Sequence, residues 1–196
     1  MPQTEITATT YRQRIEKLQE AMKEFGIQAV VLEPGPAMLY LTGVRWGKSE
    51  RTFAVVLPVK GEPVWTLPGF EEMRARELIH VGDDIRIWQE DESPYQRIAG
   101  ALQDRGVTSG RVAIDDAARF FVFDGIRKLA PKLEYVGASQ VLQAAGVDTA
   151  QPARPGPLCI VPKVTLMETL HAGHGPPSLS SLRSTVQKWS TRLKNS

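Results

Sequence analysis

The sequence has one cysteine, few histidines and no long apolar run, and each scarcity narrows the possible functions. The single Cys159 cannot form an internal disulfide, which favours a reducing compartment. No stretch approaches the roughly 18 apolar residues that a membrane-spanning helix needs. Residues 1–10 also lack the basic-then-apolar pattern of a secretory signal. We therefore expect a cytoplasmic protein with no membrane partner.

Overall charge and short motifs argue against several further classes of function. The net charge of +2 gives no general argument for a nucleic-acid partner, and none is expected. The sequence contains no Gly-rich phosphate loop, no zinc-finger spacing and no nucleophile elbow. Apolar residues make up 42% of the chain and charged residues 23%. This balance is typical of a globular protein that buries a core.

The composition changes near Ala150. Residues 151–196 contain six basic residues against one acidic residue, six of the fourteen prolines and two of the three histidines. Successive prolines between residues 152 and 157 are typical of a linker. We predict a flexible N-terminus over residues 1–10, a folded domain over 11–145, and a linker with an atypical, poorly ordered basic Pro/Ser-rich tail over 146–196. The abrupt change also motivates the hypothesis of a truncated or frame-shifted gene.

Helices alternate with short strands before this tail. Apolar spacings of three and four predict a helix over residues 11–25, and the apolar run at 27–32 predicts a strand buried on both faces. A turn at residues 60–62 between two apolar runs predicts a hairpin. A helix at 70–79 is expected to turn Phe70 and Met73 inward. Further helices are expected at 94–105, 117–129 and 139–145, and further strands at 84–88, 111–114 and 133–136. This order predicts an α/β fold, a three-layer α/β/α sandwich with a mixed sheet.

Several of these segments carry a family resemblance when they are taken together. They are the opening helix RIEKLQEAMKEFGI, the strand QAVVL, the element LYLTG at residues 39–43, the turn KGE and the later strand RVAIDD. In order and spacing, residues 11 to about 140 resemble the N-terminal domain of the creatinase/prolidase/aminopeptidase P family, the pita-bread metallopeptidases. The resemblance implies an α/β/α sandwich with a ribonuclease H-like motif. It also implies that this domain does not bind the metal.

The resemblance places the chemistry of the family in a following catalytic domain. There, carboxylates hold two divalent metal ions, such as Mn, Co or Zn, which activate water to cleave an amide before proline. Such a site needs several carboxylates on a rigid frame, and after residue 150 the side chains offer only Glu168. We expect no catalytic residues and no cofactor in this chain, which should be inactive alone. Its role would be homodimerisation and access for proline-containing peptides, if a catalytic domain is present.

One loop is a candidate recognition surface. Residues 44–51 contain Arg45, Trp46 and Arg51 between two buried elements, and arginine offers a planar fork to carboxylates. The resemblance implies that these three residues gate substrate or contact a dimer partner. The alternative is a solvated loop whose tryptophan covers the hairpin.

Two rival functions remain open. Glu168, His171 and His174 form the only metal-like cluster in the sequence, and imidazoles bind many transition metals. They suggest either incidental surface binding or a small metal-dependent hydrolase. The other rival is a stand-alone binding or interaction module that uses the sheet edge or the Trp46 loop.

The remaining titratable residues have simpler interpretations. The acidic pairs at residues 83–84 and 90–92 are expected to be solvated or to lie near a helix N-terminus. Asp115 and Asp116 are predicted to cap the helix that begins at Ala117. His80 is expected at the surface near a helix end. None of these is predicted to be catalytic.

Overall fold

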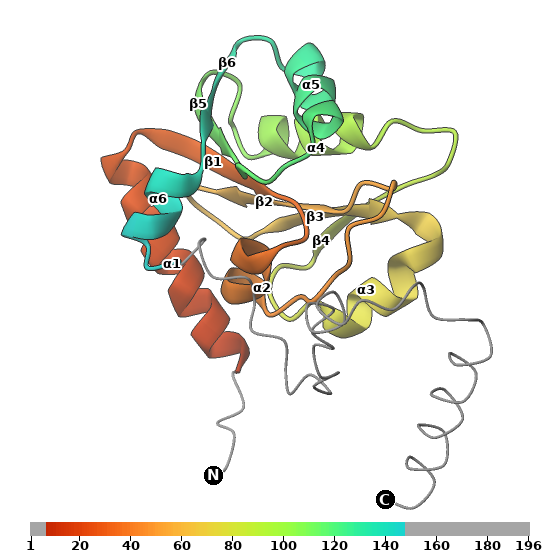
Figure 1. Cartoon of the computed structure of the whole chain (residues 1–196), viewed down its shortest axis with the longest axis horizontal. Coiled ribbons are helices and arrows are strands. Elements are labelled where there is room, and N and C mark those ends of the chain that lie inside the picture. The colour runs from red at the N-terminus through yellow and green to blue at the C-terminus, as the bar shows by residue number, and fades with distance from the viewer. Residues whose placement is uncertain (1–6, 148–196) are drawn as a thin grey trace, which may run out of the picture. The chain divides into compact units, whose positions relative to one another are not determined.

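In residues 7–147, which are the residues that this computed structural model describes, six strands form one mixed sheet (Figure 1). Their order across the sheet is β4-β3-β2-β1-β5-β6. β2 runs antiparallel to both neighbours, whereas the pairs β1–β5, β5–β6 and β3–β4 are parallel. The strands are β1 (Ile27–Leu32), β2 (Ala54–Pro58), β3 (Val64–Pro68), β4 (Asp84–Trp88), β5 (Gly110–Ile114) and β6 (Leu133–Gly137).

Helices cover both faces of the sheet and complete the three predicted layers. On one face, Leu18 of α1 and Val141 of α6 join a core that also includes residues of α2 and α3. On the other face, Ile98 of α4 and Ile126 of α5 join a second core. The helical elements are α1 (Ala8–Glu24), α2 (Pro36–Thr42), the 3₁₀ turn η1 (Gly69–Glu71), α3 (Glu72–Leu78), α4 (Pro94–Asp104), α5 (Phe120–Leu129) and α6 (Ser139–Ala144). The α/β/α sandwich with a mixed sheet is confirmed.

The centre of the sheet is buried on both sides. Ala29, Val30 and Val31 of β1 are at most 2% exposed, and every residue of β2 and β3 is buried. Strands covered by helices on both faces have continuous apolar sequences, because neither face meets water. Trp65 lies in this core, where its indole N–H donates to the Val81 carbonyl at 2.9 Å. The predicted buried strand and hairpin are confirmed.

Two helices differ from the predictions. The segment at residues 70–79 begins as the 3₁₀ turn η1, whose tighter winding breaks the assumed helical spacing. Phe70 and Met73 are therefore 63% and 82% exposed, and their inward placement was wrong. α5 begins at Phe120 instead of Ala117, because extended backbone at Arg119 precedes its first turn.

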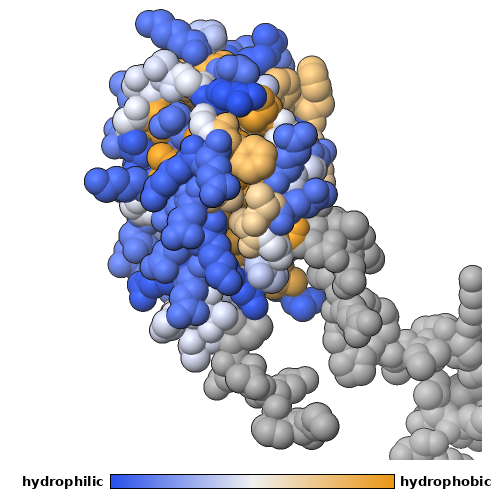
Figure 2. All heavy atoms as spheres, turned by 90° about the vertical axis from the view of Figure 1, so that its left-hand side faces the viewer, coloured by the Kyte–Doolittle hydropathy of each residue, from blue (hydrophilic) through white to orange (hydrophobic). Residues whose placement is uncertain are grey.

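Exposed apolar side chains are concentrated on two elements. The large ones are Phe70 and Met73 near α3, and Phe120, Phe121 and Leu129 on α5. On the side that carries α1 and α6, hydrophilic side chains cover most of the surface beside a narrower band of apolar ones (Figure 2). None of the helices within residues 7–147 is both long and apolar enough for a membrane crossing.

Gly43 provides a test of the local packing. It ends α2 with φ +77°, and a Cβ at this position would collide with the Tyr11 ring. We expect Gly43→Ala to lower the free energy of unfolding by about 2 kcal/mol, because left-handed backbone alone costs an L-residue roughly 1–2 kcal/mol. Gly47→Ala is the control, since Gly47 has open space around it. Urea unfolding followed by circular dichroism measures both, and equal losses would contradict the packing described.

Candidate functional site

The carboxyl ends of β1, β3, β4, β5 and β6 lie along one edge of the sheet, together with the start of β2. This arrangement follows from β2 being antiparallel to its neighbours. We call this side the carboxyl edge. It carries the segments that directly follow the five strands and the loop of residues 44–51, called the edge loop below. In open α/β sheets, ligands characteristically bind at this edge.

A buried ion pair joins the end of β1 to the start of α5. The Glu33 side chain is 1% exposed. Its Oε1 accepts hydrogen bonds from Nε and Nη2 of Arg119 at 3.0 and 2.5 Å, and its Oε2 accepts the Arg119 backbone N–H at 2.8 Å. These donors compensate for lost water, because an unpaired buried charge is strongly destabilising. Sequence reasoning missed this pair, since 86 positions separate its members and no local pattern connects them.

The same arginine holds the edge loop. Its Nη1 donates a hydrogen bond to the Ser49 carbonyl, and its Nη2 donates to the Arg51 carbonyl at 3.5 Å. Lys48 adds a second attachment, because its Nζ donates to the Ala117 carbonyl at 2.7 Å. The edge loop is thus bonded to the segment that follows β5 and, through Arg119, to Glu33 at the end of β1.

Trp46 packs along the hairpin. The half-buried indole stacks on Phe53 with centroids 4.3 Å apart and an interplanar angle of 17°. The guanidinium of Arg74 also lies over the Trp46 ring, 4.7 Å from its centroid. Trp46 therefore covers the start of β2, which agrees with the alternative interpretation of the loop. Arg45, the preceding residue, is exposed.

Arg51 lies between two acids and an exposed aromatic ring. Its Nε donates to Glu90 at 2.7 Å, and its Nη1 donates to Glu50 at 2.5 Å. Its guanidinium also lies 4.8 Å from the ring centroid of Phe70. The surface ion pairs contribute little stability. The exposed Phe70 beside this arginine, and the exposed Met73 three residues later in the sequence, are nevertheless of the types enriched at protein interfaces.

Asp115 and Asp116 bind backbone groups at the carboxyl edge. Asp115 Oδ1 accepts the Ala117 N–H at 3.0 Å. Asp116 Oδ2 accepts the Ser139 N–H at 2.9 Å and also the Ser139 hydroxyl. The prediction that this pair caps a helix from Ala117 was wrong, because α5 starts later and Asp116 bonds to the start of α6. Burial raises the pKa of Asp115, although its bond from Ala117 and the charge of Lys48 oppose this shift.

Among the other acids singled out in the sequence, Asp84, Glu90 and Glu92 form ion pairs. Asp84 accepts hydrogen bonds from Arg86, the shorter at 3.0 Å. Glu92 pairs with Arg97 at 2.7 Å, and its pKa is lowered, first by the Gln89 N–H and then by Arg97. His80 is exposed just after α3, as predicted.

The candidate metal ligands Glu168, His171 and His174 lie outside the described residues. Within residues 7–147, no group of three or more His, Cys, Asp or Glu side chains is arranged to hold a metal ion. This part of the chain therefore offers no candidate ligand cluster for the metal ions that the resemblance implies for a parent enzyme.

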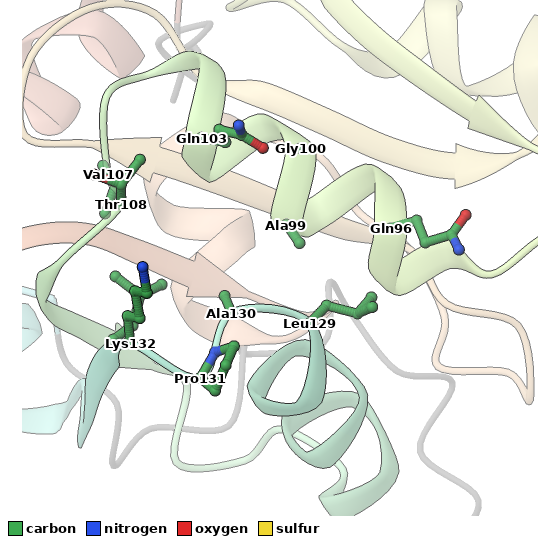
Figure 3. A pocket seen from close by; sticks show the side chains of 11 residues that line it. Gln96, Ala99, Gly100, Gln103, Val107, Thr108, Leu129, Ala130, Pro131 and Lys132 are labelled. Atoms are coloured by element: carbon green, nitrogen blue, oxygen red, sulfur yellow. The ribbon is translucent and has the colours of Figure 1, made fainter.

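A separate cavity of about 400 Å³ opens between α4 and the connection from α5 to β6 (Figure 3). It adjoins the starts of β5 and β6, at the edge opposite to the carboxyl edge. Ala99 and Leu129 contribute to its apolar lining, and Gln96, Gln103 and Lys132 are among its polar residues. The lining residues include no carboxylate, histidine or cysteine. The usual side chains of acid–base or metal chemistry are therefore missing from this cavity.

Comparison with known sequences identifies the family. The Creatinase/Prolidase N-terminal domain family matches residues 14–145, and the chain belongs to it. An uncharacterized peptidase of Schizosaccharomyces pombe is 30% identical over 131 residues, which are 60% of this chain and 28% of that protein. The probable dipeptidase PepE of Mycobacterium tuberculosis is 29% identical over 97 residues, 48% of this chain and 26% of that protein. The predicted family resemblance is confirmed.

Solved structures show the same fold. Dipeptidase PepE from Mycobacterium ulcerans is 28% identical with a TM-score of 0.61, covering 69% of this chain and 36% of that one. The prolidase of Thermococcus sibiricus is 26% identical with a TM-score of 0.61, covering 67% and 35%. The N-terminal domain of an Xaa-Pro dipeptidase from Lactobacillus brevis has a TM-score of 0.60 at 18% identity, covering 66% and 98%. The chain thus covers 26–36% of the length of the two curated relatives, of the Mycobacterium ulcerans dipeptidase and of the Thermococcus sibiricus prolidase.

The Glu33–Arg119 pair gives a prediction for stability. We expect Arg119→Met to lower the free energy of unfolding by about 3–5 kcal/mol, because it leaves a buried carboxylate without its partner. The double variant Glu33→Leu/Arg119→Met should recover much of this loss, since no buried charge remains. Arg97→Met is the matched control, because it breaks an exposed pair worth about 0–1 kcal/mol. Urea unfolding measures the four proteins, and similar losses for Arg119→Met and Arg97→Met would contradict the assignment.

Proposed function

We propose that this chain serves as the non-catalytic N-terminal domain of an Xaa-Pro aminopeptidase-like or dipeptidase-like metallopeptidase. Its membership in the Creatinase/Prolidase N-terminal domain family supports this role. The relatives named as peptidases or dipeptidases extend far beyond the matched region. Under this proposal, the divalent metal ions and their carboxylate ligands belong to a catalytic domain. This chain alone then does not hydrolyse peptides.

The attached edge loop is the observation that carries the proposal for substrate access. Arg119 and Lys48 hold the loop at the carboxyl edge, and the exposed Arg45 lies on it. A loop that is already ordered loses little conformational entropy when a ligand binds. The guanidinium of Arg45 suits the carboxylate of a short proline-containing peptide. The loop would then form one wall of the entrance to the catalytic site.

The exposed apolar residues beside the edge loop support a role in homodimerisation. Phe70 and Met73 lose little of their surface to this chain, although both are large apolar side chains. Arg51 and Arg74 lie over the aromatic rings of Phe70 and Trp46. Aromatic, methionine and arginine side chains are enriched at interfaces between subunits. This cluster is therefore the proposed dimer contact.

Catalysis and access can be tested with one series of proteins. The 196-residue chain with Mn²⁺ should show no turnover of Xaa-Pro dipeptides above the buffer rate. The domain should support turnover when it replaces the N-terminal domain of the Thermococcus sibiricus prolidase. In this chimera, Arg45→Ala should raise KM about tenfold, as expected for the loss of one charge-assisted hydrogen bond.

Lys17→Ala is the control for this series, since Lys17 is an exposed residue of α1. Turnover by the chain alone would overturn the non-catalytic assignment. Equal KM values for Arg45→Ala and Lys17→Ala would overturn the role in access.

The proposed dimer contact has its own test. Sedimentation equilibrium of the 196-residue chain should detect a homodimer, and Met73→Asp should raise its dissociation constant at least about tenfold, because a carboxylate would be desolvated in the contact. Met73 is 82% exposed, so the substitution should leave the fold intact. Lys17→Asp is the control for added negative charge. A chain that stays monomeric at all accessible concentrations would contradict this contact.

A further inference from the structure

A second pocket, at the carboxyl edge, lies beside the segment to which Lys48 of the edge loop is bonded. It has a volume of about 360 Å³ and adjoins the ends of β5 and β6 and the start of α5. Three aromatic residues and two acids share its lining: Phe120, Phe123, Tyr135, Asp115 and Asp116. Ile114, Ala118, Val136 and Gly137 complete it.

The pocket lies where the segments that follow two adjacent strands, β5 and β6, leave toward opposite faces of the sheet. After β5 the chain enters α5, which packs on one face of the sheet, and after β6 it enters α6, which packs on the other. Figure 1 shows α5 and α6 on different sides of these two strands. Adjacent parallel strands whose connections leave toward opposite faces open a crevice at their carboxyl ends, which is where open α/β sheets bind ligands.

The aromatic residues form a continuous series along one side of the pocket. The ring centroids of Phe120 and Phe123 are 6.4 Å apart, and those of Phe123 and Tyr135 are 5.6 Å apart at 84°. The Tyr135 hydroxyl donates to the Ala130 carbonyl at 2.9 Å, which fixes the orientation of that ring. Phe120 is 76% exposed, so core packing does not account for its place at the pocket.

Each of the two acids uses one oxygen for a backbone hydrogen bond, and both acids also line a smaller neighbouring pocket of about 170 Å³. Asp115 uses Oδ1 and Asp116 uses Oδ2 to accept backbone N–H groups. In the described part of the chain, no hydrogen-bond donor reaches Asp115 Oδ2 or Asp116 Oδ1. The charged groups that act on Asp115 are Lys48, Asp116 and Glu33. Burial raises the pKa of Asp115, so its anionic form is incompletely stabilised by the protein alone.

We propose that this pocket binds a small organic cation, namely an alkylammonium or guanidinium group. The faces of aromatic rings attract cations, and carboxylate oxygens accept charge-assisted hydrogen bonds from N–H groups. A neutral apolar ligand would desolvate both acids without replacing their hydrogen bonds, and an anion would be repelled by them. The cation can be a free amine or the side chain of a lysine in a peptide, since both present the same group.

The test uses the 196-residue chain and n-butylammonium chloride as the probe, with n-butanol as the neutral molecule of similar size. Chemical shifts of the Asp116, Gly137 and Ser139 amides should move saturably with n-butylammonium and not with n-butanol. Asp115→Asn should weaken this binding at least about tenfold, because a charge-assisted hydrogen bond is lost. It keeps an oxygen for the Ala117 N–H. Asp91→Asn is the control, because Asp91 is an exposed acid outside the pocket lining.

Phe120→Ser provides a second variant that should not disturb folding, because this ring is largely exposed. We expect it to weaken binding of n-butylammonium several-fold through the loss of one aromatic contact. Tighter binding of a blocked lysine tripeptide would assign the pocket to a peptide side chain, and equal binding would assign it to the ammonium group alone. No saturable shifts, equal shifts with n-butanol, or full binding by Asp115→Asn would each overturn the proposal.

Discussion

The ion pair between Glu33 and Arg119 is the interaction on which the carboxyl edge depends. Glu33 is almost completely buried, so its charge requires the donors that Arg119 supplies. The same guanidinium bonds to carbonyls of the edge loop. One arginine therefore stabilises a buried charge and positions the loop. Loss of Arg119 would therefore affect both the buried charge of Glu33 and the position of the edge loop. Neither residue lies within the loop itself.

The topology explains why the functional features gather on one side. Five of the six strands described end at the carboxyl edge, so the segments that follow them meet there. The edge loop, the exposed Phe70 and Met73 and the pocket beside β6 all lie along this edge. Such an arrangement suits a domain that binds a partner. The strands and helices form the core, and the segments between them carry the exposed side chains.

The sequence predicted the three-layer fold more accurately than the contacts at the carboxyl edge. Apolar runs and helical spacing were sufficient for β1, the hairpin and most helices, because local periodicity determines which residues are buried. Phe70 and Met73 were misplaced, because a 3₁₀ turn interrupts the spacing that would have turned them inward. The Glu33–Arg119 pair could not be predicted, since it depends on the parallel pairing of β1 and β5. Trp46 and Arg45 were recognised only as a loop with two interpretations.

The backbone order of the edge loop tests the role of Arg119 directly. Backbone NMR order parameters for residues 45–51 should lie near about 0.85 in the 196-residue chain, as in rigid backbone. In the double variant Glu33→Leu/Arg119→Met, which removes the Arg119 bonds to Ser49 and Arg51 without leaving a buried charge, the values for residues 49–51 should fall below about 0.6. Values for α1 and β1 should be the same in both proteins. A mobile loop in the wild-type chain, or an equally ordered loop in the double variant, would contradict the central role of Arg119.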